Sequence, residues 1–579
     1  MGIAIFVAWL LVACAGAPAT TSPDPVGAEP GVTLTLRASP PGLGPALDVA
    51  CSFSRPDGVP DPLVLRFAPA PPGRAPWVDQ IADVVAVDAT GAVLTVERDG
   101  DALRIETGGR PVVHVGWHLE PSDRLLTESS RFGPLWNTER LYVPGHAVVP
   151  RAEPAGTWSH DVRVELGTDG RWPVRSTLPD LTDVTFDDLV ESAFFAGGWT
   201  RVEASEGGST VDVWAAPGLD GLAAPIARTS ARIVHAQADL LGADSADRST
   251  VLLLRRDDDE EARSGHGRVG GFVLELGVDA DIEGPELIEL IAHENLHRLI
   301  GHRLRFSARD EYATLWFREG VTDYLAVRTM VEAGLLPTTR LFRLIGRAIT
   351  SYRANPASPM ASEDTLREGF WEDRDLRRLP YDKGALLGVL IDLELREQYG
   401  SDLGTWVRSL RDDPSVRALP VTGATLRDGL ERHTGASWGD FWGRYVEGTE
   451  WLPMFERLNE AGLDVVERLE PAPWFGFHAT VSATGDWVIG EVSPGSPAAR
   501  VGLVAGTPLA GPPWIPTEFA EGPARVVVTS SRGGRTVTVP ADRGQRRIYA
   551  LVERVGSDAD YRLRFGLPTA DAPGEPATR

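Results

Sequence analysis

The hydrophobic periodicity of this chain changes twice along its length, and this change limits what the chain can fold into. Residues 31–166 read as short strands, because polar and apolar side chains alternate and Pro, Gly and Asp separate the runs. From about 285 to 450 the apolar side chains recur with a helical period, and from 470 to 566 short strands return. A length of 579 residues also exceeds what one core organises. We therefore predict a multidomain α+β protein with a β-sandwich-like domain at 31–166, a mainly helical domain at 167–460 and a β-rich domain at 470–566.

The first 30 residues have the composition of an export signal followed by a tether. Residues 1–14 are an apolar run ending in Leu11-Val12-Ala13-Cys14, which resembles the bacterial lipobox, and residues 15–30 are rich in Pro, Ala and Thr. We predict a signal peptide that ends at Cys14, lipid attachment to this cysteine and a location in the cell envelope. Plain secretion and an uncleaved anchor are the alternatives. If Cys14 carries a lipid, the other cysteine, Cys51, forms no intramolecular disulfide.

Composition also bears on partners and on two polar segments. The net charge of -25 argues against a nucleic-acid partner, because such a protein needs a basic face to meet phosphates. After the signal, no segment has enough continuous apolar residues to span a bilayer. We predict that the acidic, Gly-rich stretch 257–271 is a solvated loop, with a cleft-lining role as the alternative. The tail 567–579 is predicted to be disordered.

The stretch most informative about function is His293-Glu294-Asn295-Leu296-His297, an H-E-x-x-H motif inside an otherwise apolar helical run. At about 100° per residue, two histidines four positions apart share one helix face and can bind one metal ion. The glutamate lies on the same side, where it can act as a general base. Asn295 and Leu296 are read as spacers.

A catalytic zinc site needs a third protein ligand and an open position. Downstream, "LWFREGVTDYLA" supplies Glu319 on a second predicted helix, and Asp323 lies one turn further along the same face. We predict one Zn²⁺ ion held by His293, His297 and Glu319. Asp323 is placed to orient a ligand histidine through its ring N–H.

Glu319-Gly320 with Thr322 and Tyr324, after H-E-x-x-H, resembles the gluzincins, which are thermolysin-like peptidases. A closer resemblance is to the glycyl aminopeptidase family, which joins a β domain, a thermolysin-like catalytic domain and a PDZ domain in this order. The matching stretches are "LWNTERLYVPGH", "TFDDLVESAF", the site helices and "RRLPYDKGALLGVLIDLELREQYG". The resemblance implies a zinc aminopeptidase that removes small N-terminal residues, of the Gly or Ala type, from peptide or protein termini. It also implies that Tyr381, in a Tyr-x-Lys-Gly motif, donates to the oxyanion of the tetrahedral intermediate.

The chain departs from that family where the substrate amine is read. The family carries an acidic motif of Gly-Gly-Leu-Glu-His type before the zinc helix, whereas this chain has Gly270-Gly271-Phe272-Val273-Leu274-Glu275. Glu275 is the candidate for binding the substrate amine, and a structural role in a strand is the equal alternative.

The third domain resembles the PDZ family in "WVIGEVSPGSPAARVGLVAGTPL". This resemblance implies a fold at 470–566 that binds the C-terminal carboxylate of a peptide near Trp474-Phe475-Gly476-Phe477. The chain reads Gly506-Thr507-Pro508 where the family usually has Gly-Asp.

Two other functions remain open at this point. One is an exported zinc endopeptidase with the same metal chemistry and no amine-binding glutamate. The other is an envelope protein that binds peptides through the PDZ-like domain and keeps a non-catalytic metal site. A structural zinc site needs no general base, so Glu294 and Tyr381 argue against the second.

Overall fold

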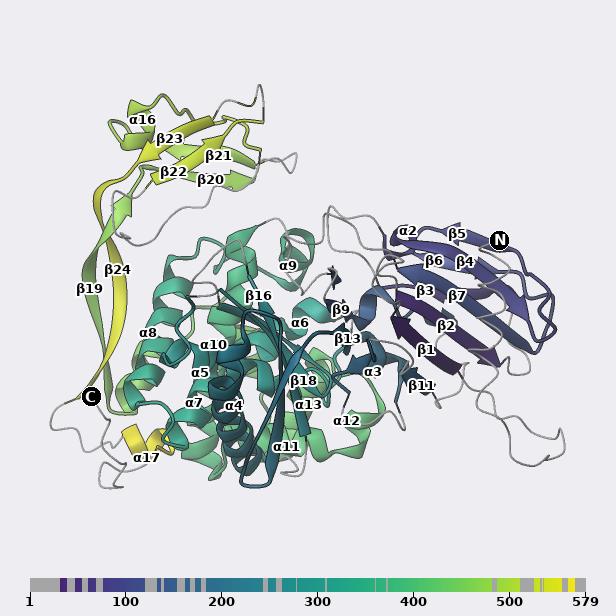
Figure 1. Cartoon of the computed structure of the whole chain (residues 1–579). Coiled ribbons are helices and arrows are strands. Elements are labelled where there is room, and N and C mark those ends of the chain that lie inside the picture. Colours follow the sequence, from purple (N-terminus) through teal and green to yellow (C-terminus); the bar gives the residue numbers. More distant parts are fainter. Residues whose placement is uncertain are drawn as a thin grey trace. The chain divides into compact units, whose positions relative to one another are not determined.

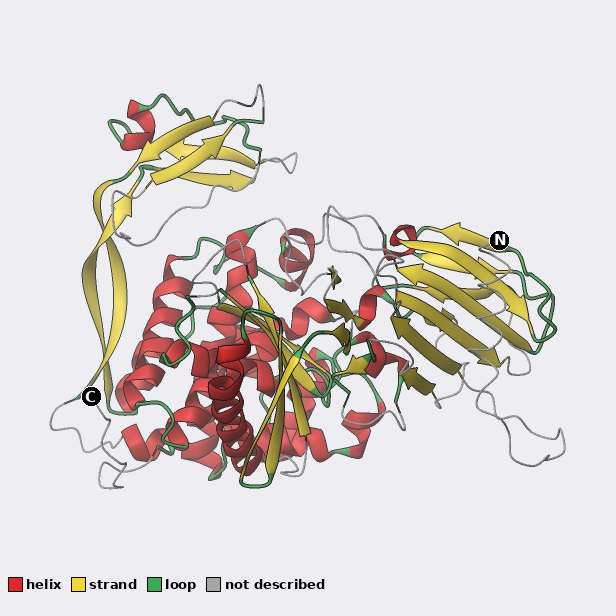
Figure 2. Ribbon diagram, in the orientation of Figure 1, coloured by secondary structure: helices red, strands yellow, loops and turns green. Residues whose placement is uncertain are grey.

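A computed structural model gives the fold of the chain (Figures 1 and 2). The described residues form two compact units that interleave along the sequence. Unit 1 contains the described residues up to 308 together with Leu325–Leu336 and Gly404–Leu426, and unit 2 contains the rest. The domain boundaries expected from the sequence stay predictions. The structure describes residues 32–567 except 39–46, 55–60, 69–75, 120–132, 137–139, 154–161, 167–171, 179–183, 243–247, 257–262, 278, 308–309, 360, 371–372, 482–486, 511–524, 532–533, 535 and 555–560.

The N-terminal part of unit 1 contains a five-stranded sheet, β11-β1-β2-β7-β4, and a four-stranded sheet, β10-β3-β6-β5. Apolar side chains from both sheets share one core, in which Phe67 and Trp117 meet edge to face with ring centroids 5.8 Å apart. Cys51 is buried in this core, on β2. The predicted β-sheet domain is thus confirmed. The strands are β1 Val32–Ala38, β2 Leu47–Ser54, β3 Leu63–Arg66, β4 Ile81–Asp88, β5 Val96–Asp99, β6 Ala102–Ile105, β7 Val112–Leu119, β10 Arg151–Glu153 and β11 Val162–Leu166; α2 is Trp77–Gln80.

A mixed five-stranded sheet, β14-β15-β16-β18-β17, supports the functional site. β15, β16 and β18 are parallel, and the edge strands β14 and β17 are antiparallel to their neighbours. The helix α4 (Asp220–Leu241) joins β15 to β16 and packs against β14 and β15 (Figure 2). The strands are β14 Thr200–Glu206, β15 Ser209–Ala215, β16 Arg248–Arg255, β17 Arg263–Arg268 and β18 Gly271–Leu276.

The edge strand β17 corrects one expectation. Residues 263–268 pair with β18 along their whole length, so they are not part of a solvated loop. Their sequence, Arg-Ser-Gly-His-Gly-Arg, has little strand propensity. Pairing with the buried apolar strand β18, which the sequence does not reveal, overrides that preference.

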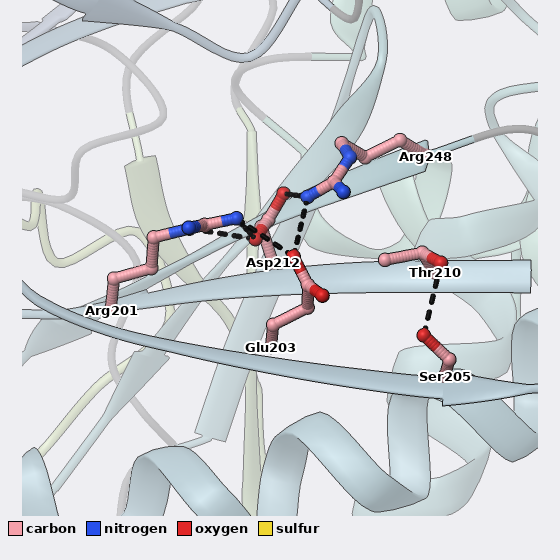
Figure 3. A network of polar contacts seen from close by, with 6 residues as sticks. All are labelled: Arg201, Glu203, Ser205, Thr210, Asp212 and Arg248. Atoms are coloured by element: carbon pink, nitrogen blue, oxygen red, sulfur yellow. Dashed lines mark hydrogen bonds and ion pairs between the residues drawn. The ribbon is translucent and has the colours of Figure 1, made fainter.

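An ion-pair network crosses the other edge of this sheet (Figure 3). Glu203 on β14 lies directly opposite Asp212 on β15, an arrangement that alone is repulsive. Arg201 bonds both carboxylates, at 2.9 Å to Glu203 and 2.5 Å to Asp212, and Arg248 from β16 also contacts both. The network therefore neutralises Asp212, which is only 5% exposed, and links three strands.

A smaller sheet, β12-β13-β9-β8, is formed by strands whose sequence interleaves with the last strands of the N-terminal sheets, and helices dominate after β18. This confirms the predicted helical part. The remaining elements are β8 Leu135–Trp136, β9 Arg140–Pro144, η2 Gly145–Ala147, β12 Arg175–Ser176, α3 Phe186–Val190, β13 Ala193–Gly197, α5 Pro285–Leu296, α6 Glu311–Leu315, η3 Trp316–Val321, α7 Thr322–Glu332, α8 Thr338–Ala354, α9 Glu363–Gly369, α10 Arg374–Tyr399, α11 Leu403–Asp412, α12 Pro414–Ala418, α13 Gly423–Thr434, α14 Gly439–Phe441, η4 Trp442–Val446 and α15 Met454–Glu460.

The C-terminal strands expected at 470–566 are inserted in a long two-stranded ribbon. β19 (Leu463–Trp474) and β24 (Asp542–Glu553) pair along twelve positions. Between them, β20 (Phe477–Val481), β21 (Trp487–Val492), α16 (Pro497–Arg500), β22 (Arg525–Thr529) and β23 (Thr536–Pro540) enclose their own core. Helix α17 (Tyr561–Phe565) follows the ribbon.

Two predictions concern parts that the structure does not describe. The signal peptide, Cys14 and the tether lie outside the described residues, as does the tail from 568 onward. Of the helices that are described, none combines the length and apolar character needed to traverse a bilayer.

Candidate metal centre

Helix α5 carries the H-E-x-x-H motif and ends within it. Pro285 occupies the first turn, where a missing N–H costs nothing, and Leu287, Ile291 and Leu296 are buried. The helix ends at Leu296, one residue before the second histidine, and His297 is its C-cap. The sequence predicts both histidines on one helix, whereas here Leu299 and Ile300 bond back to the Leu296 carbonyl in a turn that follows it. Gly301, at φ 136°, supplies the positive φ that this turn needs.

The two histidines are directed to one point. Their Nε2 atoms lie 3.0 Å apart, although the second histidine is outside the regular helix. His297 Nδ1 lies 3.1 Å from the Ile300 carbonyl oxygen. A carbonyl only accepts, so Nδ1 carries the proton and Nε2 presents its lone pair. The sequence had placed Asp323 as the carboxylate that orients a ligand histidine; for His297, the orienting group is the Ile300 carbonyl. For His293, the Asp323 role stays a prediction.

Strand β17 approaches α5 at two glycines. A Cβ on Gly265 would lie 2.8 Å from Glu294 Cγ, and a Cβ on Gly267 would lie 2.6 Å from His297 Cβ. The absence of these side chains lets the strand backbone lie against Glu294 and His297. Residues 265 and 267 therefore lie beside Glu294 and His297, and the cleft-lining role of this segment stays a prediction.

Asn295 is more than a spacer. Its Nδ2 donates to Gln237 Oε1 on α4 at 2.7 Å, and Gln237 Nε2 donates to the Ala292 carbonyl at 2.9 Å. Both amides are buried, at 7% and 3% exposure. Arg298 extends this network, donating to Ser249 Oγ at 2.5 Å. The last turn of the motif helix is thus fixed by side chains that a one-dimensional motif search ignores.

Glu319 lies on η3, a π-helical turn between α6 and α7. π-turns inside helices occur frequently at functional sites, because the extra residue redirects a side chain. The neighbouring Gly320 lies against α10, where a Cβ would come within 2.5 Å of Gly384 Cα and of Ala385 N. Gly384 in turn faces the Trp316 backbone. Two opposed glycines therefore allow backbone-to-backbone contact of η3 and α10.

The predicted ligand set forms one cluster. One donor atom from each of His293, His297 and Glu319 lies within 4.8 Å of the others. Two imidazole nitrogens and one carboxylate oxygen are the donors that catalytic zinc prefers, and the set leaves a coordination position open. The tautomer of His297 also suits metal binding. The residues present therefore fit a zinc ion.

Tyr381 lies on α10, partly buried, among charged neighbours. Arg378, one turn before it, forms a two-pronged ion pair with Asp382, both bonds being 2.9 Å, and Ser351 also donates to this carboxylate. Burial raises the pKa of Asp382 above its usual value, which Arg378 only partly offsets. Burial lowers the pKa of Arg378, but Asp382 and, more weakly, Asp323 and Tyr381 raise it. The net effect is a pKa above the usual value for arginine. A cation thus lies near the phenol.

Lys383, the third residue of the Tyr-x-Lys-Gly motif, has a structural role. It is 8% exposed, and its Nζ donates to the carbonyls of Gly448 at 2.9 Å and Val446 at 3.3 Å. It thereby binds the end of η4. Burial lowers the pKa of this ammonium to about 8.

Glu275 has the contacts of a strand residue. It is 2% exposed, accepts from Ser264 Oγ at 3.1 Å and lies 3.9 Å from Arg256. It is paired directly with Ser264, whereas the next residue of β17, Gly265, contacts Glu294. Successive strand residues alternate between faces, so the Glu275 side chain lies on the face of the sheet away from α5. These contacts favour the structural alternative, and an amine-binding role stays a prediction.

Comparison with solved structures defines the class of fold. An aminopeptidase N family protein from Idiomarina loihiensis is similar with a TM-score of 0.65 and 16% identity, over 93% of this chain and 99% of that one. An M1 zinc metallopeptidase from Deinococcus radiodurans is similar with a TM-score of 0.50 and 16% identity, over 73% and 95%. At this identity the likeness concerns the fold: a multidomain α+β architecture of the M1 aminopeptidase type.

Sequence comparison is more specific. Residues 286–379 match the model of the M61 glycyl aminopeptidase family, which confirms the resemblance found in the sequence. A search of curated proteins gave no match. The matched segment begins in α5 and ends in α10, so it contains the three clustered donors. Together the comparisons support a peptidase.

Proposed function

We propose that this protein is a zinc-dependent aminopeptidase that removes small N-terminal residues from peptides. The observation that carries the proposal is the cluster of His293, His297 and Glu319 with Glu294 beside it. The family match supports the aminopeptidase class.

The chain's own residues have distinct roles in this proposal. His293, His297 and Glu319 would hold one Zn²⁺, which when bound polarises the scissile carbonyl and lowers the pKa of a water molecule towards neutrality. Glu294 accepts the proton of the attacking water and returns it to the leaving amine. Glu294 is 4% exposed, so the proton transfer is shielded from bulk water. Tyr381 donates its hydroxyl proton in a hydrogen bond to the developing oxyanion.

A second function has one specific observation in its favour. The Glu275 side chain lies on the face of the sheet away from α5, so the residue expected to bind the substrate amine is not directed to the general base. An endopeptidase, which needs no such group, uses the same metal chemistry.

One set of measurements tests the proposal and separates the two functions. Zinc content is measured for the wild type, His297→Ala and Glu294→Gln, and hydrolysis is followed on glycyl and alanyl substrates and on the same peptides with blocked amino termini. We expect one zinc per chain, lost in His297→Ala, and a Glu294→Gln variant that keeps zinc without turnover. Cleavage of blocked peptides alone supports the endopeptidase. A wild type without zinc, or an active Glu294→Gln, contradicts both.

The location and the C-terminal domain add two proposals. We infer lipid attachment at Cys14, supported by Leu-Val-Ala-Cys and the polar tether after it. Mass spectrometry that finds an unmodified mature chain without Cys14 contradicts this inference.

For the inserted β20–β23 domain we propose a PDZ-like site for a C-terminal peptide. The order β21, Ser-Pro-Gly-Ser turn and α16 supports this, and calorimetry with free and amidated peptide termini tests it.

A further inference from the structure

A cavity in unit 2 lies between α8, α10 and the start of α15. Its volume is about 230 Å³. It is lined by Ile349, Tyr352, Arg353, Leu386, Leu452, Pro453, Met454, Phe455 and Glu456. The zinc donors and Tyr381 are not among these residues, so the cavity is distinct from the proposed metal centre.

The inner wall of the cavity is apolar, and its open side is aromatic and charged. Leu386, Leu452 and Met454 are buried, whereas Arg353, Phe455 and Glu456 are exposed. Phe455 leaves 42% of its surface in water, as does the adjacent Trp451. Exposed large aromatic side chains next to a cavity are typical of binding sites.

Two polar side chains, Tyr352 and Arg353, lie in the wall of the cavity. Tyr352 is 2% exposed, and its hydroxyl oxygen, which is shielded from solvent, accepts a hydrogen bond from the Leu452 backbone N–H. Burial raises the pKa of this phenol to about 12, so it is a donor at every physiological pH.

The second group is Arg353. Its guanidinium lies over the Trp451 ring at 4.9 Å and the Phe455 ring at 5.4 Å. None of the ion pairs between described residues includes Arg353 or Glu456. A guanidinium that lies over aromatic rings can still donate its N–H groups to an external carboxylate. Glu456 offers an acceptor for an ammonium at the same mouth.

From this arrangement we propose that the cavity binds a free apolar L-amino acid. The side chain enters the apolar cavity, the carboxylate accepts from Arg353, and the ammonium group donates to Glu456. An engineered cavity of about 150 Å³ holds benzene, so the larger volume here accommodates a phenyl group with its methylene. The site does not depend on the metal centre.

Calorimetric titration of the full chain with L-phenylalanine tests this inference. Two truncated probes separate the charges: 3-phenylpropanoate lacks the amine, and phenethylamine lacks the carboxylate. We expect Arg353→Gln to weaken L-phenylalanine and 3-phenylpropanoate at least tenfold and to leave phenethylamine unchanged. Glu456→Gln should weaken L-phenylalanine and phenethylamine and leave 3-phenylpropanoate unchanged.

Two controls make the result specific. Arg347→Gln removes an exposed arginine from the same helix outside the cavity and should bind like the wild type. His297→Ala disrupts the proposed metal centre and should retain L-phenylalanine binding. Absence of binding in the wild type overturns the inference, as does equal affinity in Arg353→Gln and Glu456→Gln. Binding lost only in His297→Ala assigns the amino acid to the metal centre and also overturns it.

Discussion

Replacing Gly265 by alanine should impair catalysis without removing the metal. The added Cβ would lie 2.8 Å from Glu294 Cγ and 2.9 Å from its Oε1, whereas ordinary contact begins at 3.4 Å. The glutamate must therefore move by about 0.6 Å, or the strand must retreat by as much. A misplacement of about 1 Å at a catalytic group can cost 10²-fold, so we expect kcat to fall by about 10-fold to 10²-fold. Gly265 has no positive φ, so the effect is not backbone strain.

The neighbouring glycine gives a matched comparison. In Gly267→Ala the Cβ would lie 2.6 Å from His297 Cβ, so the displaced group is a proposed metal ligand. This variant should lose zinc affinity, whereas Gly265→Ala should keep it. Gly221→Ala on α4, where no atom lies within 4 Å of the added Cβ, is the neutral control. The assays are steady-state kinetics with zinc supplied, zinc affinity and melting temperature. Wild-type kcat in Gly265→Ala would refute the reasoning.

Three further predictions follow from the site. Tyr381→Phe should lower kcat by about 10²-fold to 10³-fold with zinc content and melting temperature unchanged, and an unchanged kcat would return this tyrosine to a packing role. Gln237→Leu leaves the buried Asn295 amide without its acceptor, so it should lose about 1–3 kcal/mol of stability and about tenfold in zinc affinity, whereas Ser230→Ala on the same helix should keep zinc affinity. Lys383 should make the stability of the fold depend on pH. Below about pH 8 the side chain is protonated in both the folded and the unfolded state, whereas between about pH 8 and 10.5 the unfolded state binds more protons than the folded state. The free energy of unfolding of the wild type relative to Lys383→Met should therefore rise across that range. A flat difference in denaturation midpoints across this range contradicts the Lys383 assignment.

The sequence predicts those parts of the site that depend on local spacing. Two histidines four residues apart share a helix face wherever that helix lies, and a downstream glutamate in an apolar helical run is a natural third donor. The sequence does not reveal the partners of these residues. The contact of Gly265 with Glu294 depends on how β17 pairs and packs, and the Gln237–Asn295 bond joins residues 58 positions apart.

Glu275 shows why register limits such predictions. Its position before the zinc helix matched the place where an amine-binding glutamate is expected, but a strand presents its side chains to alternate faces. A shift of one residue exchanges those faces, and pairing with Ser264 places this carboxylate away from α5. The side on which a strand residue lies is fixed by its neighbours in space, which the sequence order does not show.

The contact between Gly320 and Gly384 limits how this part of the protein can evolve. Each glycine is opposed by backbone atoms of the other segment, so a side chain at either position has no space. In most packed pairs, a larger residue on one side can be accommodated by a smaller residue on the other. Here both residues already have the smallest side chain, so a substitution at one cannot be rescued by a change at the other. Each position should therefore tolerate substitution poorly, whatever residue stands at the other. Mutations that suppress a defect at either glycine should arise in the surrounding helices, where they can move the two segments apart.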